Sequence, residues 1–136
     1  MKLLALLLLL PSLALGQVVS KPPTNRFVCR GSGFTGLANL TCTPALPAGA
    51  GISFYVDSVL LSNGPTPQTL KVISSTTTAC GGSPADVTSS VYLGVNGGAM
   101  LHFFTPIKTA QSNPYLCCQG SGSTAASCTV TGFYGP

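Results

Sequence analysis

Side chains that commonly perform acid–base chemistry are scarce in this 136-residue chain. It has no Glu, two Asp (Asp57 and Asp86) and a single histidine, His102. Hydrolysis by paired carboxylates would require both Asp residues to converge, and their spacing gives no support for this. A Ser-His-Asp triad would need His102, one Asp and one of many serines, and no G-x-S-x-G motif is present. We therefore expect no catalytic residues and a protein that is not an enzyme.

His102 and two glycine-rich segments have simpler structural explanations. His102 lies in AMLHFF (99–104), within an expected strand, where a histidine that faces solvent or makes a core hydrogen bond is the commoner case. The segments RGSG (30–33) and QGSG (119–122) are not followed by the Gly-Lys-Ser/Thr of a phosphate-binding loop. Because a cysteine precedes each of them, we expect turns there.

Six cysteines form the second chemically informative set. An even number in an oxidising compartment indicates three disulfides, although many connectivities are open. Zinc is the alternative, but it would need pairs spaced as C-x2-C, and the one close pair here is directly adjacent. We expect disulfides, no metal site and no cofactor. The six residues are Cys29, Cys42, Cys80, Cys117, Cys118 and Cys128.

The N-terminal segment (1–16) predicts a secretory signal peptide, because Lys2 precedes an apolar run and small residues stand at Ala14 and Gly16. That apolar run is too short to span a bilayer, and no later stretch has transmembrane length. Residues 17–136 are expected to form a single disulfide-rich β domain. We predict a secreted protein with no transmembrane segment.

Charge is unusually rare in the expected mature chain. Residues 17–136 carry five Lys or Arg and two Asp, a net charge of +3. The positive charges are scattered, so we expect no nucleic-acid partner. Charged residues make up 6% of the chain, against about 25% in a typical globular protein. Such a surface can lie against an apolar phase or a polysaccharide wall without burying ions.

Hydrophobic alternation predicts strands over 52–62 and 69–79, separated by a turn at 63–67. A last short strand is expected at 128–134. Strand pairs this small need closure or cross-links. The fold should therefore be mainly β, either a small disulfide-stapled β-barrel or a compact sandwich.

The segment 90–104 predicts a hairpin in which two strands flank Asn96-Gly97 in a type I′ turn. Helix signals are poor, and only 84–94 has room for a single helical turn.

Two cysteine-bounded segments, CRGSGFTGLANLTC (29–42) and CQGSGSTAASC (118–128), share the pattern C-x-G-S-G. Together with FTGLANLTCTP (34–44) and the doublet Cys117-Cys118, they resemble the loops of fungal hydrophobins. That family has eight cysteines in the order single, doublet, single, single, doublet, single. Here Val28 stands where the first doublet has its leading cysteine, so the chain resembles a degenerate hydrophobin with six of the eight.

The resemblance implies a disulfide pairing. Its two pseudo-symmetric cysteine loops would be closed by Cys29–Cys42 and Cys118–Cys128. Cys80 and Cys117, whose family partners are missing here, would then join each other.

It also implies an apolar interface on the loops, for which the candidates are Phe34, Leu37, Leu40 and Leu46. For Leu37 and Leu40 a place in the core is equally well supported, since a small chain has few apolar residues to spare. Asn39-Leu40-Thr41 is an N-glycosylation sequon. A glycan on Asn39 would cover the interface, whereas an unused sequon is an ordinary turn.

From the resemblance we expect a non-enzymatic secreted surface-active protein. It would coat a fungal cell wall or adsorb and self-assemble at hydrophobic–hydrophilic interfaces. The alternative is a soluble secreted cysteine-rich effector or allergen-like β-protein that interacts with a host or wall component. Glycosylation of Asn39 would favour this alternative.

Overall fold

A computed structural model describes residues 25–47, 52–109, 115–122 and 124–136. The expected signal peptide (1–16) lies outside these residues. The described part contains ten strands and no helix, so the single helical turn considered for 84–94 is absent. The strands are β1 (Arg26–Phe34), β2 (Leu37–Asn39), β3 (Thr41–Thr43), β4 (Ser53–Asn63), β5 (Gln68–Ser75), β6 (Ala85–Asp86), β7 (Val91–Leu93), β8 (Gly98–Lys108), β9 (Tyr115–Gly120) and β10 (Ala126–Gly135).

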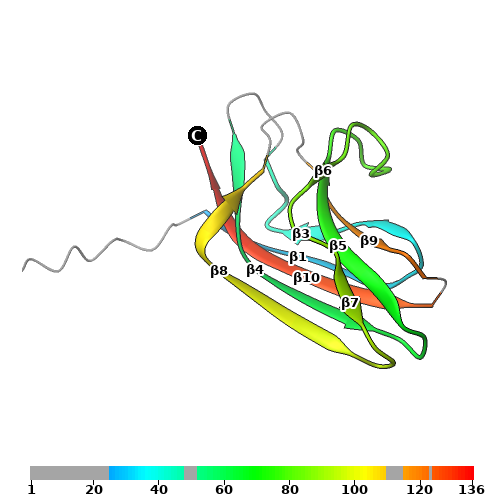
Figure 1. Ribbon diagram of the computed structural model, residues 1–136. Helices are drawn as coiled ribbons and strands as arrows, with labels where there is room; N and C mark the ends of the chain where they lie inside the picture. The colour runs from blue at the N-terminus through cyan, green and yellow to red at the C-terminus, as the bar shows by residue number, and fades with distance from the viewer. Residues whose placement is uncertain (1–24, 48–51, 110–114, 123) are drawn as a thin grey trace, which may run out of the picture.

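The strands form two antiparallel sheets that pack face to face (Figure 1). Sheet A has the order β3-β1-β10-β4-β8. Sheet B has the order β2-β9-β5-β6, with β7 also paired to β5. Among the described strands, sheet A ends at β3 and β8 and does not close on itself. Of the two predicted architectures, the compact sandwich is therefore confirmed.

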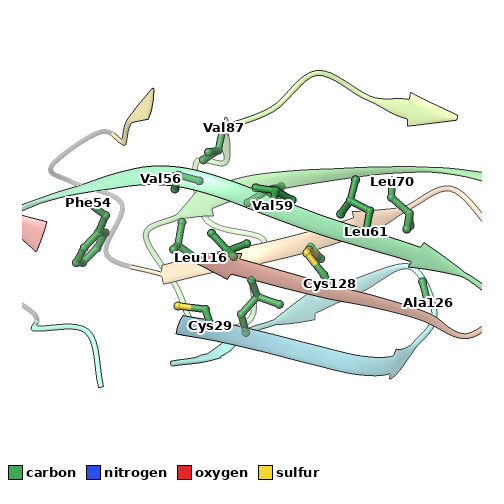
Figure 2. Packing of buried hydrophobic residues seen from close by; sticks show 14 of the residues in the cluster. Cys29, Phe54, Val56, Val59, Leu61, Leu70, Val87, Leu116, Ala126 and Cys128 are labelled. Atoms are coloured by element: carbon green, nitrogen blue, oxygen red, sulfur yellow. A yellow bond between two sulfur atoms is a disulfide. The ribbon is translucent and has the colours of Figure 1, made fainter. Parts of the chain in front are cut away.

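Side-chain alternation explains how the layers form a core. Along β4, Val56, Val59 and Leu61 point inward and are fully buried. Figure 2 shows them between the sheets, together with Leu70 of β5 and Leu116 of β9. The predicted strands at 52–62, 69–79 and 128–134 correspond to β4, β5 and β10, with β5 ending earlier and β10 extending further at both ends.

The predicted hairpin around Asn96-Gly97 is wrong in its pairing. β7 pairs with β5 in sheet B, whereas β8 pairs with β4 in sheet A. The connection crosses from one sheet to the other through a turn in which the Gly97 N–H donates to the Gly94 carbonyl at 3.0 Å. Asn96 alone in this turn has a positive φ, of 49°, so the turn is not type I′, which needs two such residues. The turn spans Gly94–Gly97, so its central residues lie one position closer to the N-terminus than the predicted Asn96-Gly97.

Buried amides hold this turn in place. The Asn63 Nδ2 donates to the carbonyls of Thr66 at 2.6 Å and Gly94 at 3.0 Å. The Gln68 Nε2 donates to Asn63 Oδ1 at 2.6 Å. These bonds satisfy polar groups that would otherwise be costly to bury, and they fix where β8 begins.

Two irregularities shape the centre of sheet A. Asp57 is an extra residue in β4, because the register against β10 shifts between Thr131 and Gly132. Opposite the same point in β8, Phe103–Pro106 bulge between His102, which pairs with Ser58, and Ile107, which pairs with Val56. Bulges of this kind redirect side chains and interrupt the ladder.

Candidate functional site

The three disulfides join Cys29 to Cys42, Cys80 to Cys117 and Cys118 to Cys128. This is the pairing that the resemblance implied. Cys29 and Cys42 are direct cross-strand partners in β1 and β3, and Cys118 and Cys128 connect β9 to β10 across the sandwich. Three disulfides are compatible with an extracellular protein.

The first cysteine loop does not present the predicted interface as one surface. Leu37 is 41% exposed, whereas Leu40 is only 4% exposed and belongs to the core. Phe34 and Leu46 are half-buried and pack against that core. The chain crosses from sheet A to sheet B and back between β1 and β3. This crossing places Leu40 between the layers, where its N–H donates to the Leu116 carbonyl at 3.0 Å.

Asn39 ends β2, and its side chain is exposed, as is that of Thr41 two residues later. The sequon is therefore accessible. Asn39 also lies on the rim of a cleft of about 330 Å³. The cleft is lined by Asn39, Leu40, Thr41, Cys42, Ala45, Leu46, Tyr115 and Leu116. None of these described lining residues has a carboxylate, an imidazole or a free thiol, so they supply no strong acid, base or nucleophile.

A different apolar surface lies on the outer face of sheet A. We define the outer patch as Leu60, Met100 and Phe104, which are 51%, 72% and 99% exposed. Leu60 and Met100 are cross-strand partners in β4 and β8. The ring centroids of His102 and Phe104 lie 5.9 Å apart, edge to face, and His102 follows Met100 by two residues in β8. Large side chains this exposed require a functional explanation when they gather on one face.

Ser and Thr side chains of β4 and β10 line the outer face of sheet A beside the outer patch. Ser58 and Thr131 share a hydrogen bond of 2.6 Å, and Thr131 donates to Asp57 Oδ1 at 2.5 Å. Arg26 forms an ion pair with the other carboxylate oxygen of Asp57. The face is thus amphipathic, with an apolar border on β8 and β4, a row of hydroxyl groups next to it, and the Arg26–Asp57 ion pair beside Thr131. The outward residues of this row are Ser58, Ser62, Ser127, Thr129 and Thr131.

His102 is close in the ladder to Ser58, but the parts of a catalytic triad are not connected. Both carboxylate oxygens of Asp57 are taken by Arg26 and Thr131, and the described residues contain no hydrogen bond from His102 to Ser58 or Asp57. Asp86 forms an ion pair with Lys71 at 2.6 Å. These contacts give both carboxylates a structural role.

Sequence reasoning missed the outer patch, although a signal was present. In AMLHFF both alternating sets are largely apolar, with Ala99, Leu101 and Phe103 half-buried and Met100 and Phe104 outside. A strand with one face in water normally alternates apolar with polar residues. In β8 the outward-facing set is Met100, His102 and Phe104, with His102 as its one polar member, so this set indicates a surface that contacts something.

Within residues 25–47, 52–109, 115–122 and 124–136 there is no helix with the length and hydrophobicity needed to cross a bilayer. The same ranges contain no cluster of three His, Cys, Asp or Glu side chains that would hold a metal ion. No protein-family model matches the chain, and no curated protein is significantly similar to it in sequence. Neither comparison shows a relationship to hydrophobins, so the resemblance rests on the cysteine loops alone.

Proposed function

We propose that this chain is a non-enzymatic, secreted surface-active protein, hydrophobin-like in its action, that adsorbs at hydrophobic–hydrophilic interfaces such as a fungal cell-wall surface. The observation that carries the proposal is the outer patch. Its members protrude from a sheet face instead of filling the core, and Phe104 is 99% exposed. We therefore propose that the adsorbing surface lies on β8 and β4 and not on the first cysteine loop.

The energetics of the patch support adsorption. Moving a large apolar side chain fully out of water is favourable by about 1.5–3 kcal/mol, so three of them offer several kcal/mol when they enter an apolar phase. The neighbouring Ser and Thr side chains carry no charge, and the nearby charges of Arg26 and Asp57 are paired with each other, which lowers the cost of approaching that phase. Lys108, at the end of β8, lies beyond the bulge and away from Leu60 and Met100.

The scaffold suits this role because it does not have to unfold to expose apolar groups. Cys118–Cys128 links the two layers of the sandwich, and Cys29–Cys42 links β1 to β3. Cross-links restrict the unfolded chain, so adsorption through the patch leaves the core closed.

Dynamic surface tension tests the proposal with a matched pair of variants. Phe104→Ser removes the most exposed apolar ring, and we expect it to slow the fall in surface tension markedly. Leu37→Ser removes an exposed leucine from β2, outside the patch, and should behave like the wild type. Both variants should keep their melting temperature. Equal adsorption by all three proteins would exclude the outer patch as the adsorbing surface.

The accessible sequon favours the alternative function, a soluble secreted cysteine-rich effector or allergen-like β-protein with a host or wall partner. A glycan on Asn39 would sit at the rim of the 330 Å³ cleft. Intact-mass measurement before and after glycosidase treatment decides whether Asn39 is modified. A glycosylated protein that leaves surface tension unchanged would support the alternative.

A further inference from the structure

We infer that two copies of this protein pair through the exposed edge of β8 and join their A sheets into one continuous antiparallel sheet. β8 is the last strand of sheet A, and in the described part of the chain β4 is its one hydrogen-bonded neighbour in the sheet. An open edge of this kind is a template for another strand. The pairing uses main-chain groups, so it does not depend on the adsorption proposed above.

The register determines which main-chain groups point outward. The Asn63 N–H donates to the Gly97 carbonyl at 2.8 Å, which makes these two residues a hydrogen-bonded pair. Bonded and non-bonded pairs alternate along an antiparallel ladder. Every second residue of β8, counted from Gly98, therefore turns its N–H and C=O away from β4. The described residues provide no partner for these groups, which belong to Gly98, Met100 and His102.

This segment is complementary to itself. A two-fold axis at Met100 places it opposite Met100 of the second copy, and Gly98 opposite the second copy's His102. Each such pair exchanges an N–H and a C=O in both directions, so all outward groups of the three residues are satisfied. Glycine opposite histidine leaves room for the imidazole ring. Closed pairing of identical surfaces is the commonest symmetry of homo-oligomers.

Charge also favours a second copy as the occupant. Monomeric proteins commonly protect edge strands with Lys or Pro; the segment 98–102 that would pair contains neither, and Pro106 and Lys108 lie further along β8. The single charged residue of β8, Lys108, follows the bulge. In the two-fold register the two Lys108 side chains lie at opposite ends of the junction. Two positively charged molecules can therefore meet here without bringing like charges together.

The ends of the paired segment are defined by the fold. On one side the Gly94–Gly97 turn leads away to sheet B, and on the other the bulge at Phe103–Pro106 interrupts the strand. The junction is short, so its strength depends on the side chains that it covers. Met100 and Leu60, both mostly exposed in one copy, would flank the axis in the pair. Phe104 lies beyond the paired residues.

Sedimentation equilibrium of the secreted mature protein in bulk solution tests the pairing. We expect a monomer–dimer equilibrium that depends on concentration. Met100→Lys places two like charges across the axis and should raise the dissociation constant roughly tenfold or more. Ser32→Lys adds the same charge at an exposed position of β1, two strands further from the edge than β4, and should leave the constant unchanged. A protein that is monomeric at every soluble concentration, or equal effects of the two lysines, would overturn the inference.

A cross-link tests the register without changing a charge. The Cα atoms of a hydrogen-bonded antiparallel pair lie about 5.5 Å apart, within the range that a disulfide spans. Under mild oxidation Met100→Cys should yield a covalent dimer, and peptide mapping should show position 100 joined to itself with the three native disulfides intact. Ser62→Cys, on β4, should not cross-link. Cross-linking of both or of neither would contradict the two-fold register.

Phe104→Ser separates this inference from the proposed function. It should weaken adsorption while leaving the dimer dissociation constant unchanged, because Phe104 lies outside the paired segment. Failure of adsorption in the wild type with an intact dimer would overturn the proposed function alone. A monomeric protein that still adsorbs would overturn the pairing alone.

Discussion

Cys117 and Cys118 are neighbours in β9, and their side chains point to opposite faces of sheet B. Cys118 points between the layers and bonds to Cys128 of β10. Cys117 points outward and bonds to Cys80, in the loop after β5, where a second small cluster includes Ile73 and Tyr115. Successive residues of a strand alternate between its faces, so one doublet both links the sheets and fastens a loop outside them.

Removing each disulfide of the doublet should therefore have different consequences. The double variant Cys118→Ala/Cys128→Ala should lose about 2–5 kcal/mol of unfolding free energy, together with core contacts, as measured by denaturant unfolding. Cys80→Ala/Cys117→Ala should lose stability and also become sensitive to proteolysis within 76–84. Preferential cleavage of 76–84 in the first variant and not the second would contradict this assignment.

Gly132 should be the least replaceable glycine of β10. A Cβ there would lie 2.1 Å from the Tyr55 carbonyl oxygen and 2.9 Å from the Phe27 ring. We expect Gly132→Ala to destabilise the protein by about 1–3 kcal/mol or more, since the backbone of β4 must shift to accept it. Gly135→Ala, on the same strand, has no atom within 4 Å of its Cβ and is the matched control. Similar melting temperatures for both variants would disprove this close approach.

The same substitution should change the free energy of unfolding strongly at Leu40 and hardly at all at Leu37. Leu40→Ser removes a core side chain and buries a hydroxyl, so it should lower the free energy of unfolding by roughly 2–5 kcal/mol. Leu37→Ser should change it by no more than about 0.5 kcal/mol, as expected for a surface position. Thermal and denaturant unfolding measure both values. A stable Leu40→Ser variant would mean that this leucine is not in the core.

The turn before β8 should depend on Asn96. Its φ of 49° lies in the left-handed region, which a β-branched residue resists. Asn96→Val should therefore destabilise the protein by about 1–2 kcal/mol, whereas Asn96→Gly should be tolerated. Gly97 is needed for another reason, because a Cβ there would lie 2.9 Å from the Gly94 carbonyl oxygen. Equal melting temperatures for the two Asn96 variants would place the strained residue elsewhere.

Features that depend on local alternation were predictable from the sequence. The strands around Val56, Val72 and Val130 follow from period-two hydrophobicity, and β structure with disulfides follows from composition and cysteine number. Which sheet a strand joins was not predictable, because pairing depends on partners far away in the chain. That is why Asn96-Gly97 suggested a hairpin, and why Leu40 was equally plausible as surface and core.

The outer patch escaped prediction for a related reason. A hairpin over 90–104, as the sequence predicts, defines no solvent face for Met100 and Phe104. Their exposure follows from the pairing of β8 with β4 at the border of sheet A.

The position of β10 has a consequence for the order in which this molecule can assemble. β10 is the last of the ten strands in sequence, yet it lies at the centre of sheet A, between β1 and β4. Both neighbours are synthesised long before it and have no direct pairing with each other. During translation β1 and β4 therefore each have one edge whose main-chain hydrogen-bonding groups lack their partner, β10. The complete sheet A can form only after residues 126–135 have emerged from the ribosome, and its formation is slowed by these long loop closures.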